Sequence, residues 1–341
     1  MPGLKARRRI PHNARMPARP RHSALNPPLH SGLQRSAAQR RTLLAGALFG
    51  TAWGSAAAPA TIADSPTLRK IREAGVISLG YRDASVPFSY LDEAQRPIGY
   101  SVDICQHIVQ AVKKRLGLRE LELRYVPVSS ATRVSLVANG QVDLECGVTT
   151  NNAERQRKVA FTITTYVAAS RLVSRRVAPV LRLDDLRQKT VASTVGTTSL
   201  HHLQDLSTSR GLELQILAAR DDPEAFRMVE TGRAAAYAMD DVLLRATVAA
   251  ARRPEDFVIS DEALSVEPYG IMLGRDDPEF KRVADEAITT LFRTGEIFRL
   301  YQRWFQSPIP PRGLNLQLPM HPAMRRVVDH PTDSADPAVY R

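Results

Sequence analysis

The 341-residue sequence lacks the common signatures of catalytic and nucleotide-binding sites. It contains no H-E-x-x-H metal motif, no G-x-S-x-G nucleophile motif, no G-x-x-x-x-G-K phosphate loop and no C-x-x-C pair. The adjacent His201 and His202 would diverge by about 100° on a helix, so they cannot easily share a metal ion. These absences give no support to a metalloenzyme, a serine hydrolase or an ATPase, and we expect no cofactor.

Acidic residues are absent from residues 1–60, which contain ten Lys or Arg. The remaining chain has 37 basic and 35 acidic residues and is therefore nearly neutral, although the formal net charge of the whole chain is +12. A nucleic-acid-binding domain carries its excess of basic residues on its folded surface. The charge pattern thus argues against nucleic acid as a partner and assigns the basic residues to a separate N-terminal extension.

Residues 1–60 also contain the features of an export signal. The stretch "QRRTLLAGALFGTAWGSAAAPATIA" has paired arginines, a weakly apolar run and a final A-x-A site at 58–60. The Arg-Arg-x-Leu-Leu order resembles a twin-arginine signal. A membrane anchor is disfavoured because the run is short and interrupted by three glycines, and no Cys follows it to carry a lipid. We expect an exported protein whose mature chain starts near Thr61, with Met16 as an alternative first residue of the translated chain.

The chain has only two cysteines, Cys105 and Cys146. An exported protein could pair them. Because Cys usually behaves as a small hydrophobic residue, two buried thiols are the expected state.

After the signal, predicted strands and helices alternate in two cycles. The first has strands at 76–81, 121–128 and 142–146 and helices at 102–117 and 130–141, and the second has strands near 190–195, 212–219, 234–239 and 265–275 separated by helices. A βαβαβ order predicts a parallel sheet with crossover helices, here twice. The Pro-rich tail from Pro308 is expected to be an arm outside the core.

Polar residues gather where the predicted strands end. Ligands of open α/β sheets bind beyond the carboxyl ends of the strands. The residues found there are Arg82, Ser130, Arg133, Thr149, Thr150, Arg155, the turn 196–199 and Asp240. Each alone is typical of a helix cap, and the acidic pairs that begin helices are read as caps too. Taken together, three arginines, several hydroxyls and one acid favour an anion-binding site.

These residues lie in motifs that resemble the periplasmic amino-acid-binding proteins of ABC importers, the bacterial extracellular solute-binding proteins of family 3, and most of all those that bind glutamate and aspartate. The motifs include "GYRDASVPFSY" (80–90), "GYSVDI" (99–104), "PVSSATRVSLVANGQVDLECGVTTNNAERQ" (127–156), "VGTTS" (195–199) and "EPYGIML" (267–273). The resemblance implies an α/β fold of the two-lobed periplasmic-binding-protein type (type II). Each lobe would be a mostly parallel sheet flanked by helices, with the ligand cleft between them.

The same resemblance implies a division of the chain. Lobe 1 would comprise 65–168 and 266–310, lobe 2 would comprise 172–262, and 311–341 would form the Pro-rich C-terminal arm. It also implies roles for single residues. Arg155, with Thr150 and the backbone of Thr198, would bind the ligand α-carboxylate, and Asp240 would accept the α-ammonium.

The side-chain carboxylate of an acidic ligand would be held by Arg82, Ser130 and Arg133. Two positions depart from the family pattern. Asp222 stands where a histidine is expected and would brace an arginine or repel the ligand, and Val148 replaces a serine. Asn151 and Glu154 have the spacing of a capping box before the helix that carries Arg155.

The resemblance therefore implies a monomeric receptor that binds L-glutamate or L-aspartate and delivers it to the membrane subunits of an ABC permease. A second hypothesis is an enzyme on the same fold, similar to the cyclohexadienyl dehydratases, with Asp222 as the general acid. A receptor sensing domain is a third, although no transmembrane helix or signalling module follows.

Overall fold

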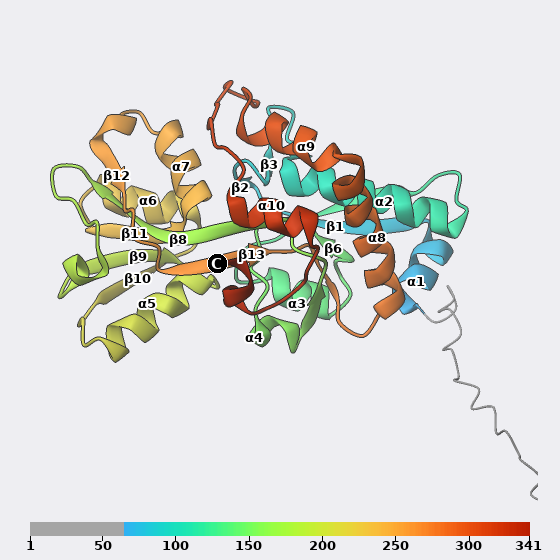
Figure 1. Ribbon diagram of the computed structural model, residues 1–341, viewed down its shortest axis with the longest axis horizontal. Coiled ribbons are helices and arrows are strands. Elements are labelled where there is room, and N and C mark those ends of the chain that lie inside the picture. The colour runs from blue at the N-terminus through green and yellow to red at the C-terminus, as the bar shows by residue number, and fades with distance from the viewer. Residues whose placement is uncertain (1–64) are drawn as a thin grey trace, which may run out of the picture. The chain divides into compact units, whose positions relative to one another are not determined.

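The computed structural model describes residues 65–341, and the predicted extension, twin-arginine signal and cleavage site lie outside this range. Two sheets dominate the described residues, each with helices on its faces (Figure 1). We call the residues around the first sheet lobe 1 and those around the second lobe 2. No helix between residues 65 and 341 is long and apolar enough to cross a bilayer.

The sheet of lobe 1 has the order β5-β1-β6-β14-β7. Its strands are β1 (Val76–Tyr81), β5 (Glu122–Pro127), β6 (Leu144–Glu145), β7 (Val159–Phe161) and β14 (Met272–Gly274). The helices of this lobe are α1 (Pro66–Ala74), α2 (Tyr100–Leu116), α3 (Arg133–Ala138), α4 (Ala153–Gln156), α8 (Pro278–Thr294) and α9 (Glu296–Phe305). A small sheet of β2 (Ala84–Ser85), β3 (Ser89–Leu91) and β4 (Pro97–Ile98) adjoins β1 in sequence.

The sheet of lobe 2 has the order β10-β9-β11-β8-β12, and β13 also pairs with β8. Its strands are β8 (Tyr166–Arg175), β9 (Thr190–Thr194), β10 (Gln215–Ala219), β11 (Ala236–Asp240), β12 (Phe257–Ile259) and β13 (Ser265–Tyr269). The helices are α5 (Thr198–Ser209), α6 (Asp222–Glu230) and α7 (Asp241–Ala250), with 3-10 turns η2 (Leu183–Leu186) and η3 (Pro254–Asp256). Figure 1 shows α5 on one side of this sheet and α6 and α7 on the other.

Both sheets are mixed, whereas the sequence predicted mostly parallel sheets. In lobe 1, β1 pairs in parallel with β5 and β6, but β14 is antiparallel to β6 and β7. In lobe 2, β9 is parallel to β10 and β11, and β8 is antiparallel to all its neighbours. The antiparallel strands are those through which the chain leaves lobe 1 and returns to it. The alternation of strands and helices in the sequence does not reveal the direction of these strands.

The strands β8 and β13 form the connection between the lobes. They pair antiparallel from Ser265 opposite Ser170 to Tyr269 opposite Tyr166. A bridge between Thr150 and Tyr269 then joins β13 to the segment that follows β6 in lobe 1. The predicted α/β fold of two lobes is confirmed, while the exact lobe boundaries stay a prediction.

The two cysteines form a disulfide, so the expectation of two buried thiols is wrong. Cys105 on α2 and Cys146 after β6 are bonded across 41 residues. Both side chains are buried in the same core cluster, as apolar cysteines would be. The disulfide forms because α2 packs against the end of β6. The spacing of the two cysteines in the sequence does not predict this contact.

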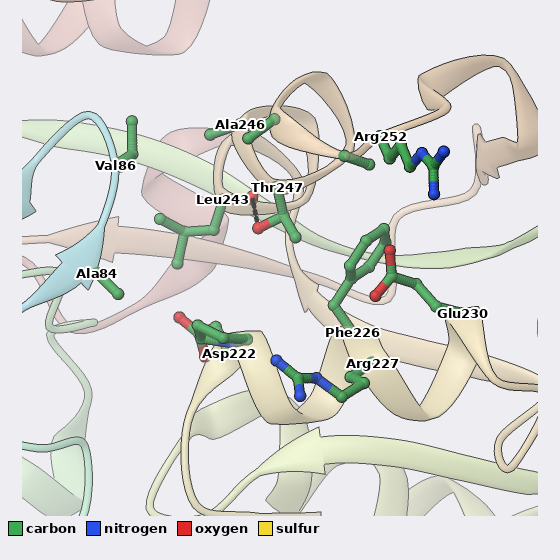
Figure 2. Close-up of a pocket in the computed structure, with 13 residues that line it drawn as sticks. Ala84, Val86, Asp222, Phe226, Arg227, Glu230, Leu243, Ala246, Thr247 and Arg252 are labelled. Carbon is green, nitrogen blue, oxygen red and sulfur yellow. Dashed lines mark hydrogen bonds between the residues drawn. The ribbon is translucent and has the colours of Figure 1, made fainter. Parts of the chain in front are cut away.

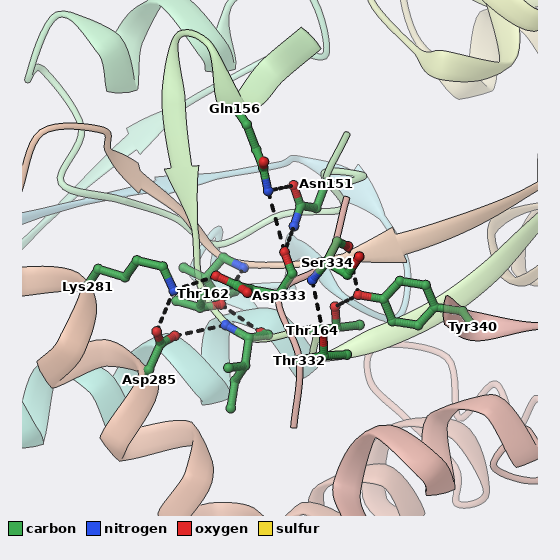
Figure 3. Close-up of polar contacts among 12 residues, drawn as sticks. Asn151, Gln156, Thr162, Thr164, Lys281, Asp285, Thr332, Asp333, Ser334 and Tyr340 are labelled. Atoms are coloured by element: carbon green, nitrogen blue, oxygen red, sulfur yellow. Dashed lines mark hydrogen bonds and ion pairs between the residues drawn. The ribbon is translucent and has the colours of Figure 1, made fainter. Parts of the chain in front are cut away.

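The C-terminal segment packs against the core, so the predicted arm is also wrong. Helix α10 (Pro322–Asp329) buries Ala323, Met324 and Val327, and the turn η4 (Pro337–Tyr340) buries Tyr340. Figure 3 shows this segment beside lobe 1, where the carbonyl of Asp333 accepts hydrogen bonds from Asn151 and Gln156. The high proline content favoured an arm, although the sequence of this segment also forms the short amphipathic helix α10.

Candidate functional site

A cleft between the lobes brings together eight of the nine residues predicted to bind a ligand. It is lined by Arg82, Ser130, Arg133, Val148, Thr150, Thr197, Thr198, Asp222, Met239, Asp240 and Leu243. The space between these atoms, with its mouth included, is about 260 Å³. The volume open to a water molecule is only about 10 Å³, so the walls of the cleft lie close against one another in this structure.

Arg155 is the ninth predicted residue, and it lies at the edge of the cleft without lining it. One terminal nitrogen of its guanidinium donates to the carbonyl of Thr150 at 2.8 Å. The other donates to the carbonyl of Gly196 in lobe 2 at 3.2 Å. Arg155 therefore connects the two walls of the cleft.

The lobes touch where Gly196 faces Ser130. A Cβ added to Gly196 would lie 2.6 Å from the carbonyl oxygen of Ser130, and the φ angle of Gly196 is +77°. Real Cβ atoms do not approach a backbone oxygen this closely, and only glycine adopts this φ without strain. The turn before α5 is therefore able to come this close to lobe 1 because of its glycine.

Three buried arginines dominate the electrostatics of the site. Arg82, Arg133 and Arg155 are 5%, 2% and 8% exposed, and within residues 65–341 none of them forms an ion pair. The Nη1 of Arg133 donates to the carbonyl of Val148 at 2.9 Å, while the Nε atoms of Arg82 and Arg133 are buried without a partner. Burial, reinforced by the charge of Arg155, lowers the pKa of Arg133 to about 9. Buried cations without partners are costly unless an anion pairs with them.

Asp240 supplies the opposite charge from lobe 2. It ends β11, and its Oδ2 accepts a hydrogen bond from the hydroxyl of Tyr269. Its Oδ1 is buried and has no hydrogen-bond partner among residues 65–341. Burial raises the pKa of Asp240 well above its usual range, and the nearby charge of Glu267 raises it further. The free oxygen is placed to accept a cation such as an ammonium group.

Asp222 contacts neutral groups, so the prediction that it braces an arginine is wrong. Its Oδ1 accepts hydrogen bonds from Thr194 Oγ1 at 2.6 Å and from Tyr237 Oη at 3.0 Å. The preceding Asp221 caps α6 by accepting from the backbone N–H of Glu224, as the sequence predicted for the acidic pair. Figure 2 shows Asp222 at the start of α6, beside a second pocket between α6 and α7 that also includes Leu243.

The short helix that carries Arg155 is capped by a different residue from the one predicted. The side chain of Asn152 accepts from the backbone N–H of Arg155 at 2.9 Å. Asn151, which was expected to begin a capping box with Glu154, instead donates to the Asp333 carbonyl at 2.8 Å. Either of the two adjacent asparagines could cap this helix by its position in the sequence. Asn151 is bonded to the C-terminal segment, and Asn152 is the cap.

Sequence reasoning missed two buried carboxylates beside the cleft, Glu145 and Glu267. Glu145 ends β6, and Glu267 lies on β13, where it accepts hydrogen bonds from Thr198 and Ser265. Glu145 is the last residue of an apolar strand, and in the sequence it is therefore read as part of that strand. Among the described residues, no group of three or more His, Cys, Asp or Glu side chains is arranged to hold a metal ion.

A two-lobed α/β fold with an ionic cleft between the lobes is typical of solute-binding proteins, a class whose lobes close on the ligand about a hinge. Residues 77–307 match the family described as bacterial extracellular solute-binding proteins, family 3, and the chain belongs to this family.

Two curated relatives share much of the sequence. The L-glutamate/L-aspartate-binding protein of Pseudomonas aeruginosa is 47% identical over 79% of this chain and 89% of its own length. The glutamate/aspartate import solute-binding protein of Escherichia coli is 40% identical over 84% of this chain and 94% of its own.

Solved structures agree with the fold. The arginine-binding protein ArgBP of T. maritima, in a mutant form, matches with a TM-score of 0.60 and 27% identity, covering 70% of this chain and 98% of that one. The solute receptor for L-cysteine of Neisseria gonorrhoeae matches with a TM-score of 0.61 and 25% identity, covering 70% and 92%.

Proposed function

We propose that the protein is the solute-binding component of an ABC importer and that it binds L-glutamate and L-aspartate in the cleft. The observation that carries the proposal is the set of charges. Within the part of the chain that the structure describes, lobe 1 has three buried arginines without ion pairs, and lobe 2 has a buried carboxylate oxygen without a partner. A free acidic amino acid has two carboxylates and one ammonium, which complements this set. The names of the two curated relatives support the same ligands.

In the proposed complex, Arg155, Thr150 and the backbone of Thr198 bind the α-carboxylate. Asp240 accepts the α-ammonium through its free Oδ1. Arg82, Ser130 and Arg133 bind the side-chain carboxylate, for which a planar guanidinium provides paired donors. Val148 contributes its carbonyl to the orientation of Arg133, so its replacement of a serine leaves that contact intact.

Delivery to a membrane permease and export to the periplasm belong to the same proposal. Lobe closure about β8 and β13 would present a closed surface to the permease, and the protein would act as a monomer. The enzyme alternative has less support, because the two curated relatives are named as binding proteins.

One titration tests the proposal. The purified protein is freed of bound ligand and titrated by calorimetry with the twenty amino acids. We expect glutamate and aspartate to bind most tightly. Tighter binding of a basic or an aliphatic amino acid would contradict the ligand assignment, and turnover of a cyclic precursor would favour the enzyme.

A further inference from the structure

The buried carboxylate of Glu145 has no assigned role in ligand binding. Its side chain is 0% exposed at the carboxyl end of β6, between Gly80 of β1 and Met272 of β14. Among the described residues, its Oε2 accepts one hydrogen bond, from Thr149 Oγ1 at 2.7 Å, and its Oε1 is buried without a partner. A carboxylate held by a single neutral donor is poorly compensated, so its charge acts on the groups around it.

The environment of Gly147 places this carboxylate beside the first arginine. A Cβ added to Gly147 would lie 2.1 Å from Glu145 Oε1 and 3.2 Å from Cγ of Arg82. The two atoms are therefore no farther apart than these distances combined. Gly147 leaves room for a carboxylate next to the stem of Arg82, and a larger residue would displace it.

The charge of Glu145 also reaches the other two arginines, although it forms an ion pair with neither. It opposes the effect of burial on the pKa of both Arg133 and Arg155. Glu267 acts on Arg155 as well, but it lies on β13 and accepts hydroxyl donors from Thr198 and Ser265. Glu145 belongs to lobe 1, as the three arginines do.

We propose that Glu145 sets the charge of the cleft: it competes with the carboxylates of the ligand for the three arginines, and thereby limits the affinity for acidic amino acids relative to amides. This inference rests on the proposed function. In the free protein Glu145 partly compensates the arginines. When the ligand binds, its carboxylates approach the same guanidinium groups and are repelled by the carboxylate of Glu145. This repulsion lowers the affinity and so allows the receptor to release its ligand.

The isosteric variant Glu145→Gln tests the inference, since its amide oxygen can still accept from Thr149. With the negative charge removed, we expect a lower melting temperature for the free protein, because the arginines lose their compensation. We expect glutamate and aspartate to bind about tenfold more tightly, and glutamine to change less because its side chain is neutral. A purely structural role would lower the melting temperature and weaken all ligands.

A matched control is Asp143→Asn. Asp143 is a buried carboxylate just before β6, and it contacts Lys70 and the backbone N–H of Ser78 away from the cleft. Its variant should lose stability while the dissociation constants stay as in the wild type. Should Glu145→Gln not accumulate as folded protein, Glu145→Asp shortens the side chain and draws the negative charge back from the arginines. It should bind glutamate more tightly than the wild type, by a smaller factor than expected for Glu145→Gln.

The outcomes separate this inference from the function itself. A wild-type protein that binds no acidic amino acid overturns the proposed function. A wild type that binds glutamate, with a Glu145→Gln variant whose glutamate affinity is unchanged or weaker, overturns only the role of Glu145. For Glu145→Asp, a glutamate affinity equal to or weaker than that of the wild type has the same consequence.

Discussion

The guanidinium of Arg155 in lobe 1 donates a hydrogen bond to the carbonyl of Gly196 in lobe 2 at 3.2 Å. The same side chain holds the Thr150 carbonyl at 2.8 Å. One residue thus joins the segment after β6 to the turn before α5, at the edge of the cleft. The contact between the lobes and the proposed binding of the α-carboxylate therefore depend on the same guanidinium.

Replacement of Arg155 by Ala should weaken every amino-acid ligand. Loss of one partner of a buried charged pair costs about 2–5 kcal/mol, which corresponds to roughly 30-fold or more in the dissociation constant. Calorimetry with glutamate and glutamine measures the effect. Lys158→Ala, on an exposed side chain just beyond α4, is the control, and equal losses in both variants would refute the role of Arg155.

Replacement of Arg133 by Ala should reduce the affinity for acidic ligands more than for amides. Arg133 is proposed to bind the side-chain carboxylate, which glutamine lacks. We expect a loss of roughly 30-fold or more for glutamate and a clearly smaller one for glutamine. Arg82→Ala should behave in the same way. Equal losses of affinity for glutamate and glutamine would indicate that these arginines bind the part that the two ligands share.

Asp240 should make glutamate binding depend on pH. Burial raises its pKa in the free protein, whereas a bound ammonium favours the ionised form, so binding releases a proton from any protein molecule in which Asp240 is protonated. The affinity should therefore fall as the pH drops through the raised pKa of Asp240 and level off above it. Calorimetry in buffers of different ionisation enthalpy counts the released protons.

Asp240→Asn should abolish this proton release and weaken all amino acids, whereas Asp205→Asn on the exposed face of α5 should leave both quantities unchanged. Proton release that persists in Asp240→Asn would assign the titration to another group.

The disulfide should contribute substantially to stability. Linking residues 41 positions apart removes chain entropy from the unfolded state worth about 4 kcal/mol in the loop-closure treatment. Cys105→Ala should lower the free energy of unfolding by an amount approaching this value, measured by denaturant titration under oxidising conditions. If reduction of the wild type does not move the unfolding midpoint, the bond carries no stability.

Truncation of Tyr340 tests whether the C-terminal segment is part of the folded core. Its side chain is 3% exposed, and its hydroxyl contacts Thr164 Oγ1 and the Ser334 carbonyl, each at 2.8 Å. Tyr340→Ala should cost about 3 kcal/mol of stability. Val339→Ala, an exposed neighbour, should cost little. Equal unfolding midpoints for both variants would indicate that the C-terminal segment is an arm outside the core.

The sequence allowed the fold class and most of the cleft to be predicted because both depend on local signals. Strand ends followed by Arg82, Thr150 or Asp240 are visible as short polar stretches after apolar runs, and the topology brings such ends together. The resemblance to a known family supplied the order of the lobes.

The features that sequence reasoning missed depend on tertiary contacts. The partner of Cys105, the core role of Tyr340 and the hydroxyl partners of Asp222 are set by elements far apart in the chain. Glu145 was overlooked because a buried charge at the end of a strand looks like part of the strand. The choice between Asn151 and Asn152 as helix cap was decided by Asp333, which lies 182 residues beyond Asn151.

The close approach of Gly196 to Ser130 has a practical consequence for ligand sensing. A methyl carbon at Gly196 would lie only 2.6 Å from the carbonyl oxygen of Ser130, so the two segments would have to move apart. Gly196→Ala would thus act as a wedge at the rim of the cleft. Such a protein would retain the proposed ligand-binding residues of both lobes, but the ligand would contact the residues of one lobe only. The substitution would thus separate the first binding step from the closure of the lobes.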